Sequence, residues 1–400
     1  MAGKLYTQED FDKQTDRTGT RSIKWDRREM VFGNAGVIPL WVADMDFETP
    51  DFIREKIAKR LEHPFLGYTF RGDGFANSFV GWVQRRHNWT VHPAWVTFMP
   101  GVVSAVSVAV LAYTQPGDEV IIQPPVYHPF YFCVEGHGRK LILNHLIHKD
   151  GRFTFDLELL KSQITPKTRM LILSSPHNPG GTVWSPAELA GLVAVCKEHN
   201  IWIISDEIHS DLVFSPNRHT PILKVAEDYQ ERIVITMAPS KTFNLAAMST
   251  SVVVIPDPKA RKTYEDLVHT LHIGMGNVFG FEALEAAYEE GDQWLDQLMI
   301  YLTGNRQFIH DFLKAELPQV GMMIPDATYM AWLDFNSLGL SQDDLNKFMI
   351  EKAGLGLNPG TQFGPGGEGF MRLNFSCQRY LLAKALKQLK AAMDQIGPTQ

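Results

Sequence analysis

The sequence predicts an α/β protein with a mostly parallel central sheet, followed by a smaller α+β part. Three observations lead to this fold class. Short β-branched runs alternate with helical patterns between Trp95 and Pro256. The runs are apolar along their length, as in strands covered on both faces. After Pro256, long helical stretches surround isolated strands. The expected strands of the sheet are VTFM (Val96–Met99), EVIIQ (Glu119–Gln123), KLILNHL (Lys140–Leu146), RMLILSS (Arg169–Ser175), IWIIS (Ile201–Ser205), RIVITM (Arg232–Met237) and SVVVIP (Ser251–Pro256).

Taken in chain order, residues 1–49 are mostly irregular and rich in Trp, Pro and Gly, which predicts an arm that packs against another surface and joins the small domain. Residues 50–290 are expected to form the large domain and residues 291–400 the small one. Ser185 to Glu188 (SPAE) is typical of a helix start, because serine caps the helix and glutamate can bond back to the cap. The expected helices are Ser185–Asn200, Pro258–Thr270, Asn277–Glu290, Asp292–Ala315 and Tyr380–Ile396, and the expected strands of the small domain are Thr328–Phe335 and Phe370–Ser376.

The composition excludes several classes of protein. The 400 residues are 44% hydrophobic and 21% charged, as in ordinary folded proteins, and the net charge of −7 offers no positive field to nucleic acid or an anionic membrane. The most apolar long stretch, Gly101–Tyr113, is shorter than a membrane span. Cys133, Cys196 and Cys377 lack the spacing of a disulfide framework or zinc ribbon, and the polar N-terminus is not a secretory signal. We therefore expect a cytoplasmic protein.

Two weaker motifs have simpler explanations. The run Gly364–Gly369 formally matches GxGxxG, but a dinucleotide site needs a preceding strand and a helix that opens within the motif. A loop that leads to Arg372 explains this run better. His145 and His148 lack further ligands nearby, so no metal site is expected.

Polar groups follow three successive predicted strands of the sheet. Asn178 lies in the loop after RMLIL, Asp206 ends IWIIS, and Lys241 follows RIVITM. Taken singly, these residues are more simply a turn, a helix cap and a surface charge. Together they place an amide, an acid and an amine at one edge of a parallel sheet, where such folds bind ligands. This combination suits a pyridine aldehyde cofactor, since lysine forms an imine, a carboxylate keeps the ring nitrogen protonated, and an amide donates to the phenolic oxygen.

The sequence also resembles a known family over nearly its whole length. The motifs are PLWVADMDF (Pro39–Phe47), GYTF (Gly67–Phe70), PPVYHP (Pro124–Pro129), SSPHNPGGT (Ser174–Thr182), SDEIHSDL (Ser205–Leu212), SKTFNL (Ser240–Leu245) and RLNF (Arg372–Phe375). They resemble, in this order, the fold-type I enzymes that depend on pyridoxal 5′-phosphate, in the class I/II aminotransferase superfamily. Within it, the chain is most similar to the carbon–sulfur β-lyases of the MalY/PatB type. The resemblance implies an aspartate aminotransferase-like fold and a homodimer with shared active sites.

The resemblance also implies roles for individual residues. Lys241 would bind the cofactor covalently and move the Cα proton of the substrate. Asp206 would pair with the ring nitrogen, Asn178 would donate to the ring's phenolic oxygen, and Tyr127 would lie against the ring face. The residues expected to hold the phosphate are Gly101, Val102 and Val103 at a helix start, Ser240, and Tyr68 from a second subunit. Arg372, with Asn178 and the backbone at Ala43, would hold the α-carboxylate of the substrate.

Two positions depart from the aminotransferase pattern. Many aminotransferases have a tyrosine at the position of His209 and a phosphate-binding arginine at the position of Ser249. Both differences favour the lyases, which split L-cystathionine or cysteine S-conjugates into a thiol, pyruvate and ammonia. An aminotransferase with the same core is the alternative. A third possibility is a protein of this fold that binds a regulatory partner. The catalytic residues are shared by the first two, so the motifs alone do not separate them.

Overall fold

The computed structural model describes residues 4–395, and its largest sheet contains seven strands in the order β2-β10-β9-β8-β7-β3-β4. Strand β10 runs antiparallel to both β2 and β9, and the other neighbouring pairs are parallel. All seven strands expected from the sequence form this sheet, and the prediction of a mostly parallel sheet is confirmed. The strands are β2 (Val96–Met99), β3 (Glu119–Ile122), β4 (Lys140–Leu143), β7 (Thr168–Ser174), β8 (Trp202–Asp206), β9 (Ile233–Met237) and β10 (Ser251–Val254).

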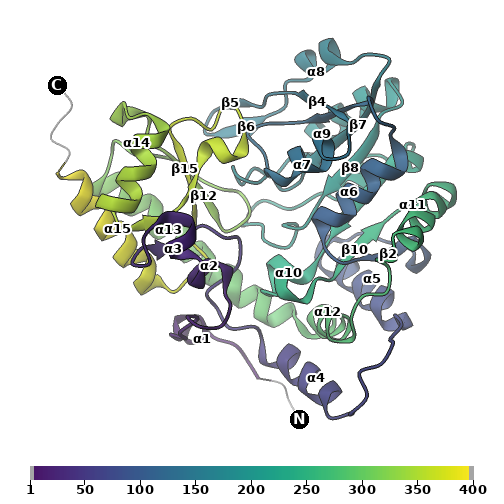
Figure 1. The fold of residues 1–400 in the computed structure, drawn as a ribbon, viewed down its shortest axis with the longest axis horizontal. Coiled ribbons are helices and arrows are strands. Elements are labelled where there is room, and N and C mark those ends of the chain that lie inside the picture. The colour runs from purple at the N-terminus through teal and green to yellow at the C-terminus, as the bar shows by residue number, and fades with distance from the viewer. Residues whose placement is uncertain (1–3, 396–400) are drawn as a thin grey trace.

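Both faces of this sheet are covered by helices (Figure 1). Neighbouring strand residues belong to different cores: Ile203 packs into one hydrophobic cluster and Ile204 into another. Helices α6, α7 and α11 supply the second cluster, while α5, α9 and α12 supply the first. The helices are α1 (Gln8–Asp12), α2 (Ile23–Asp26), α3 (Arg28–Phe32), α4 (Asp51–Leu61), α5 (Asp73–His87), α6 (Val102–Tyr113), α7 (Pro129–Glu135), α8 (Leu157–Gln163), α9 (Pro186–Glu198), α10 (Pro239–Thr242), α11 (Pro258–Thr270), α12 (Val278–Glu290), α13 (Asp292–Glu316), α14 (Gln342–Lys347) and α15 (Arg379–Met393).

A second sheet has the order β11-β12-β15-β14 and pairs its strands antiparallel. It lies near α13 and α15, and the purple N-terminal residues lie beside the same helices in Figure 1. The N-terminal strand β1 pairs with β13, with Ile38 opposite Leu355. The remaining strands are β1 (Ile38–Pro39), β5 (Ile147–Lys149), β6 (Arg152–Thr154), β11 (Gly321–Met323), β12 (Met330–Asp334), β13 (Leu355–Gly356), β14 (Asn358–Pro359) and β15 (Phe370–Asn374).

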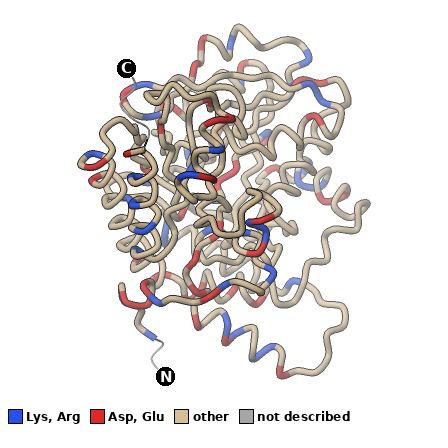
Figure 2. Tube along the Cα trace, turned by 60° about the vertical axis from the view of Figure 1, so that its left-hand side comes forward, with Lys and Arg blue, Asp and Glu red and all other residues tan. Residues whose placement is uncertain are grey.

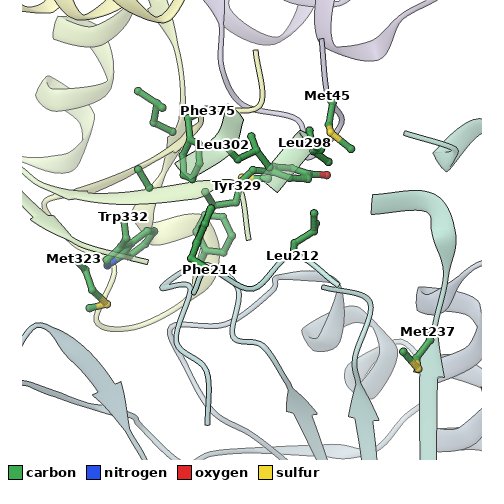
Figure 3. Close-up of a cluster of buried hydrophobic side chains, with 14 of the residues drawn as sticks. Met45, Leu212, Phe214, Met237, Leu298, Leu302, Met323, Tyr329, Trp332 and Phe375 are labelled. Carbon is green, nitrogen blue, oxygen red and sulfur yellow. The ribbon is translucent and has the colours of Figure 1, made fainter. Parts of the chain in front are cut away.

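Apolar side chains from distant segments meet between the two sheets (Figure 3). Leu212 and Phe214, from the chain after β8, lie near Tyr329, directly before β12, and near Leu302 of α13. All four are almost fully buried. This packing connects the loops at the end of the large sheet to the second sheet, and so it sets the position of one wall of the site relative to the other.

The helix ends follow local sequence signals. Ser185 and Glu188 form the expected capping box at the start of α9. The expected C-terminal helix corresponds to α15 (Arg379–Met393), and its expected end at Ile396 lies outside the described residues. The expected strand KLILNHL is shorter in the structure, since β4 ends at Leu143. The divisions at residues 49 and 290 stay predictions.

Candidate active site

The register of the large sheet brings three strand ends to one edge. Ser174 at the end of β7 pairs with Asp206 at the end of β8, and Asp206 in turn pairs with Thr236 in β9. Because parallel strands end at the same edge, the chain segments that follow them converge there. Asn178 lies in the loop after β7, and Lys241 lies on α10, directly after β9. The amide, acid and amine noted in the sequence therefore share one edge.

A cleft opens at this edge. Most of the residues singled out in the sequence line it: Ala43, Gly101, Val102, Val103, Tyr127, Asn178, Asp206, Ser240 and Lys241. Arg372 reaches the same place from β15, where its Nη1 donates to Asn178 Oδ1 at 3.0 Å. Tyr68 is different, because it lies on the segment between α4 and α5 and is 97% exposed. It is therefore not a core residue of this chain.

Lys241 is a partly buried amine with a single hydrogen bond among residues 4–395. Its Nζ donates to the carbonyl oxygen of Ala43 at 2.8 Å. Burial, reinforced by the positive charge of Arg372, lowers the pKa of Lys241 to about 8. A substantial fraction of the amine is therefore neutral close to physiological pH, as a nucleophile or general base must be.

Asp206 is a buried carboxyl group that accepts few hydrogen bonds to offset the cost of burying its charge. The backbone N–H of Ile208 donates to its Oδ1 at 3.1 Å. Burial raises the pKa of Asp206 to about 7, against the opposing effects of that hydrogen bond and of Lys241. No ion pair of Asp206 is found among residues 4–395. A buried acid of this kind is costly unless a cationic group meets it, and a protonated ring nitrogen is such a group.

Arg372 is held by acceptors on three sides. Beyond Asn178, its Nη2 donates to Asn358 Oδ1 at 2.7 Å and to the carbonyl oxygen of Trp41 at 3.0 Å. Its Nε is buried and has no hydrogen-bond partner among the described residues. Burial lowers the pKa of Arg372 to about 10, so the group stays charged at neutral pH. A fixed guanidinium with an unused N–H group suits a carboxylate ligand.

The start of α6 offers a place for an anion. Gly101, with a φ of 140° that favours glycine, precedes the helix, and its carbonyl accepts the first helical bond, from Ala105 N–H at 3.0 Å. The N–H groups before Ala105 have no intrahelical acceptor, and the helix dipole favours negative charge at this end. The hydroxyl-bearing residues Ser240, Ser249 and Thr250 line the same cleft. These groups are suited to hold a phosphate.

Tyr127 lines the cleft from the loop before α7. Burial and the nearby Asp206 raise its pKa to about 12, so the phenol keeps its proton at neutral pH. The position is compatible with the expected contact to a ring face. No group of three or more His, Cys, Asp or Glu side chains that could hold a metal occurs among residues 4–395.

The sequence analysis missed several residues that shape the cleft. Tyr329 donates through its hydroxyl to the carbonyl oxygen of Ala43 at 3.0 Å, the same oxygen that Lys241 contacts. Asn374 donates to the carbonyl oxygens of Val42 at 2.6 Å and Asp44 at 2.7 Å. Asn374 belongs to the quoted motif RLNF, which was a signal that could have identified it. Tyr329 had no comparable signal.

Comparison with known proteins places the chain in a family. Residues 35–389 match the family Aminotransferase class I and II. The chain is 45% identical to cystathionine beta-lyase PatB of Bacillus subtilis, over 96% of this chain and 99% of that protein.

Two solved structures are similar over 96% of this chain. A PLP-bound putative aminotransferase from Clostridium difficile is 37% identical, with a TM-score of 0.94 over 99% of that chain. A PLP-bound C-S lyase from Staphylococcus hominis is 33% identical, with a TM-score of 0.89 over 97% of that chain. With the fold and the edge of the sheet described above, these matches show that the chain belongs to the class I and II aminotransferase family.

Proposed function

We propose that the protein is a pyridoxal 5′-phosphate-dependent carbon–sulfur β-lyase that converts L-cystathionine or cysteine S-conjugates into a thiol, pyruvate and ammonia. The observation that carries the proposal is the grouping of Lys241, Asp206, Asn178 and Arg372 at one edge of the sheet. It occurs in a chain that is 45% identical to a cystathionine beta-lyase over 96% of its length.

The groups of the cleft fit pyridoxal phosphate. Asp206 is a buried acid that lacks a cationic partner, and the ring nitrogen would supply one. The free N–H groups after Gly101 suit the phosphate, and Lys241 has the lowered pKa that covalent attachment needs. When bound, the cofactor provides a protonated ring that withdraws electrons from the Cα of an attached amino acid.

The residues of this chain would orient the substrate and move its proton. Arg372 already binds Asn178, so both groups can face one α-carboxylate beside the segment that carries Ala43. Lys241, neutral in part at pH 7 to 8, would take the Cα proton. Loss of the sulfur substituent from Cβ would complete the elimination. Asp206 is only 5% exposed, so little water reaches this acid.

A direct test incubates the purified protein with L-cystathionine and pyridoxal phosphate, without any 2-oxo acid. We expect stoichiometric pyruvate, ammonia and free thiol. An absolute requirement for a 2-oxo acid would contradict the lyase and favour the alternative, an aminotransferase. Absence of turnover with both, together with no visible absorption band, would contradict the cofactor assignment as well. His209 and Ser249, at positions where many aminotransferases have tyrosine and arginine, are why we favour the lyase.

We also propose that the protein acts as a homodimer in the cytoplasm. Phe65, Tyr68 and Phe70 are 73%, 97% and 85% exposed on one segment, and apolar groups of this size are usually covered. A second copy would cover them and bring Tyr68 to the phosphate of its neighbour. The three cysteines are free and buried, which fits a reducing compartment. No helix of residues 4–395 is long and apolar enough to cross a bilayer. Sedimentation at a range of dilutions tests the dimer, and a fully active monomer would contradict it.

A further inference from the structure

Arg372 is a buried cation whose hydrogen-bond partners are neutral groups. The residue is 4% exposed, and it donates to the side-chain oxygens of Asn178 and Asn358 and to the carbonyl oxygen of Trp41. No Asp or Glu of residues 4–395 forms an ion pair with it. Taking a charge out of water is costly, so a buried guanidinium without a carboxylate partner needs other stabilising contacts.

The ring of Phe363 supplies such a contact on the face of the guanidinium. The Cζ atom of Arg372 lies 4.7 Å from the centroid of this ring, within the distance at which an aromatic face attracts a cation. Phe363 is completely buried, and the attraction is strongest where water is excluded. The N–H bonds of a guanidinium all lie in its plane, so a ring that covers the face blocks none of them. Phe363 therefore restricts the tilt of the guanidinium and leaves its donors available.

Phe363 is held in place from two parts of the molecule. Its ring meets that of Trp332 in β12 edge-on, with the ring centroids 5.5 Å apart. Its carbonyl oxygen accepts from the backbone N–H of Val126 at 2.8 Å. Val126 directly precedes Tyr127, which lines the cleft. Phe363 thus connects the second sheet, which carries Arg372, to the loop after β3 that carries Tyr127.

The residue after Phe363 fixes the path of the chain. Gly364 has a φ of 94°, a conformation that favours glycine. A Cβ atom at this position would clash with the hydroxyl oxygen of Tyr131 in α7, so another residue fits only if the chain shifts. The run Gly364–Gly369 forms the loop that leads into β15, as expected from the sequence. Its close approach to α7 keeps the turn that carries Phe363 against the loops of the large sheet.

We propose that Phe363 is a positioning residue for the α-carboxylate of the substrate, because its ring holds the guanidinium of Arg372 in the plane from which the N–H groups reach that carboxylate. This inference rests on the proposed function, since it needs an amino-acid substrate bound at Arg372. An N–H group donates well only when it points at its acceptor. A guanidinium that can tilt loses part of this contact although it keeps its charge.

The test measures how tightly the holoenzyme binds two amines, followed by the change in its visible absorption band. Glycine has an α-carboxylate and no β-substituent to lose, whereas methylamine has no carboxylate. In Phe363→Leu we expect the dissociation constant of glycine to rise about tenfold, because the ring face is lost from beneath Arg372. The constant of methylamine should change by less than about twofold, since methylamine has no group for Arg372 to bind.

Two further variants separate the ring face from packing. A trifluorinated phenylalanine at position 363 keeps the shape of the ring but withdraws electron density from its face, and we expect the glycine constant to rise about threefold. Phe214→Leu is the matched control. Phe214 is also almost fully buried and lies under the guanidinium of Arg306 at 4.2 Å, but it does not line the cleft. Both constants should stay unchanged in this variant.

Equal rises for glycine and methylamine in Phe363→Leu, or no rise for either, would overturn the proposal and leave Phe363 a packing residue. If circular dichroism shows that Phe363→Leu does not fold, the trifluorinated ring carries the test, and an unchanged glycine constant there would overturn the proposal as well. A natural protein without a visible band after addition of pyridoxal phosphate would overturn both the proposed function and this inference. A protein that behaves as expected with glycine but releases no pyruvate from L-cystathionine would contradict the lyase alone and support the role of Phe363.

Discussion

Two lysines of this molecule, the buried Lys24 and the partly buried Lys241, have opposite surroundings. Lys24, in the N-terminal part, is completely buried and donates to Asp46 Oδ2 at 2.7 Å, while Arg17 bonds the other oxygen of the same carboxylate at 2.7 Å. Lys241 is partly buried, and within the described part of the chain its amine has only the carbonyl oxygen of Ala43 as a partner. The N-terminal cluster neutralises its charges internally. In the cleft, the charged groups have few partners within the protein and are therefore able to contact a ligand.

Two aspartates, Asp211 and Asp206, show the same difference between a fully bonded group and one with few partners. Asp211 accepts from Trp82 Nε1 at 3.0 Å, His87 Nε2 at 2.8 Å and Thr242 Oγ1 at 2.8 Å. Burial opposes its ionisation, but these hydrogen bonds outweigh the effect and lower its pKa. Asp206, five positions earlier in the sequence, has one backbone donor and a raised pKa. Complete partnering thus marks a structural carboxylate, whereas incomplete partnering marks one that faces a ligand.

Charged groups of both signs are also interspersed along the rest of the described chain, as Figure 2 shows. Most of their ion pairs are at least partly exposed, such as Lys262 with Asp266 and Arg86 with Asp296. Such pairs contribute little to stability. The buried N-terminal cluster and the cleft are therefore the two charged regions worth comparing. Substitutions in each region test whether their charged groups serve stability or ligand binding.

The largest effect is expected from a matched pair of lysine substitutions. Lys241→Met should reduce β-elimination by at least about a thousand-fold, because it removes both the attachment point and the general base. It should leave the stability of the cofactor-free protein unchanged or higher, since the lost amine is partly buried and has no ion pair within residues 4–395. Lys24→Met should leave Asp46 short of a partner and cost about 3 kcal/mol of unfolding free energy. Pyruvate release and urea denaturation measure the two effects. A stability loss in Lys241→Met as large as in Lys24→Met would contradict the comparison.

A smaller effect is expected at the guanidinium of Arg372. Arg372→Lys retains the charge but loses the fork that reaches Asn178 and Asn358 together. We expect the KM for L-cystathionine to rise about 10- to 100-fold, which corresponds to the loss of a charge-assisted hydrogen bond. Steady-state kinetics measure it. Arg306→Lys is the control, because Arg306 is a partly buried arginine that lies over the ring of Phe214 and donates to the carbonyl oxygen of Pro325; it should leave the KM unchanged. Equal KM values for the natural protein and Arg372→Lys would exclude Arg372 from carboxylate binding.

The large sheet was predictable because its strands are apolar on both faces and separated by clear helical patterns. All seven expected strands form it, and α11 begins and ends at the expected residues, Pro258 and Thr270. The hairpin of β5 and β6 was missed although Asp150-Gly151 is a strong turn signal, and both residues have positive φ. Its first strand is exposed along its length, so it carries no apolar periodicity to detect.

The cleft was predictable only in part. Asn178, Asp206 and Lys241 follow successive strands, so spacing alone places them at one edge. The contact of Tyr329 with Ala43 joins residues 286 positions apart, and that of Arg372 with Asn178 joins residues 194 positions apart. Such pairs depend on how the second sheet packs against the first. No local pattern in the chain encodes that packing.

The smallest effect concerns the pH dependence of stability in the cofactor-free protein. The pKa of Asp206 is about 7 in the folded state and near 3.8 for an unperturbed group. Between these values the folded protein holds a proton that the unfolded chain has released, so stability falls as the pH rises. We expect Asp206 alone to contribute a loss of about 1 kcal/mol per pH unit between about pH 5 and 7. Buried histidines with a lowered pKa, such as His177, contribute the opposite slope, so the contribution of Asp206 is the difference between the natural protein and a variant that lacks the acid.

Asp206→Asn should remove the contribution of Asp206, so its stability should rise more steeply with pH than that of the natural protein. Asp211→Asn should leave the slope in place while lowering stability at every pH in the range, because the pKa of Asp211 is depressed and the carboxylate is ionised throughout. Urea titrations at several pH values measure both. Saturation with pyridoxal phosphate should also remove the contribution of Asp206, because a cationic ring nitrogen would hold Asp206 ionised. An equal slope in Asp206→Asn and in the natural protein would mean that the acid is partnered within the chain, and the distinction between the two carboxylates would fail.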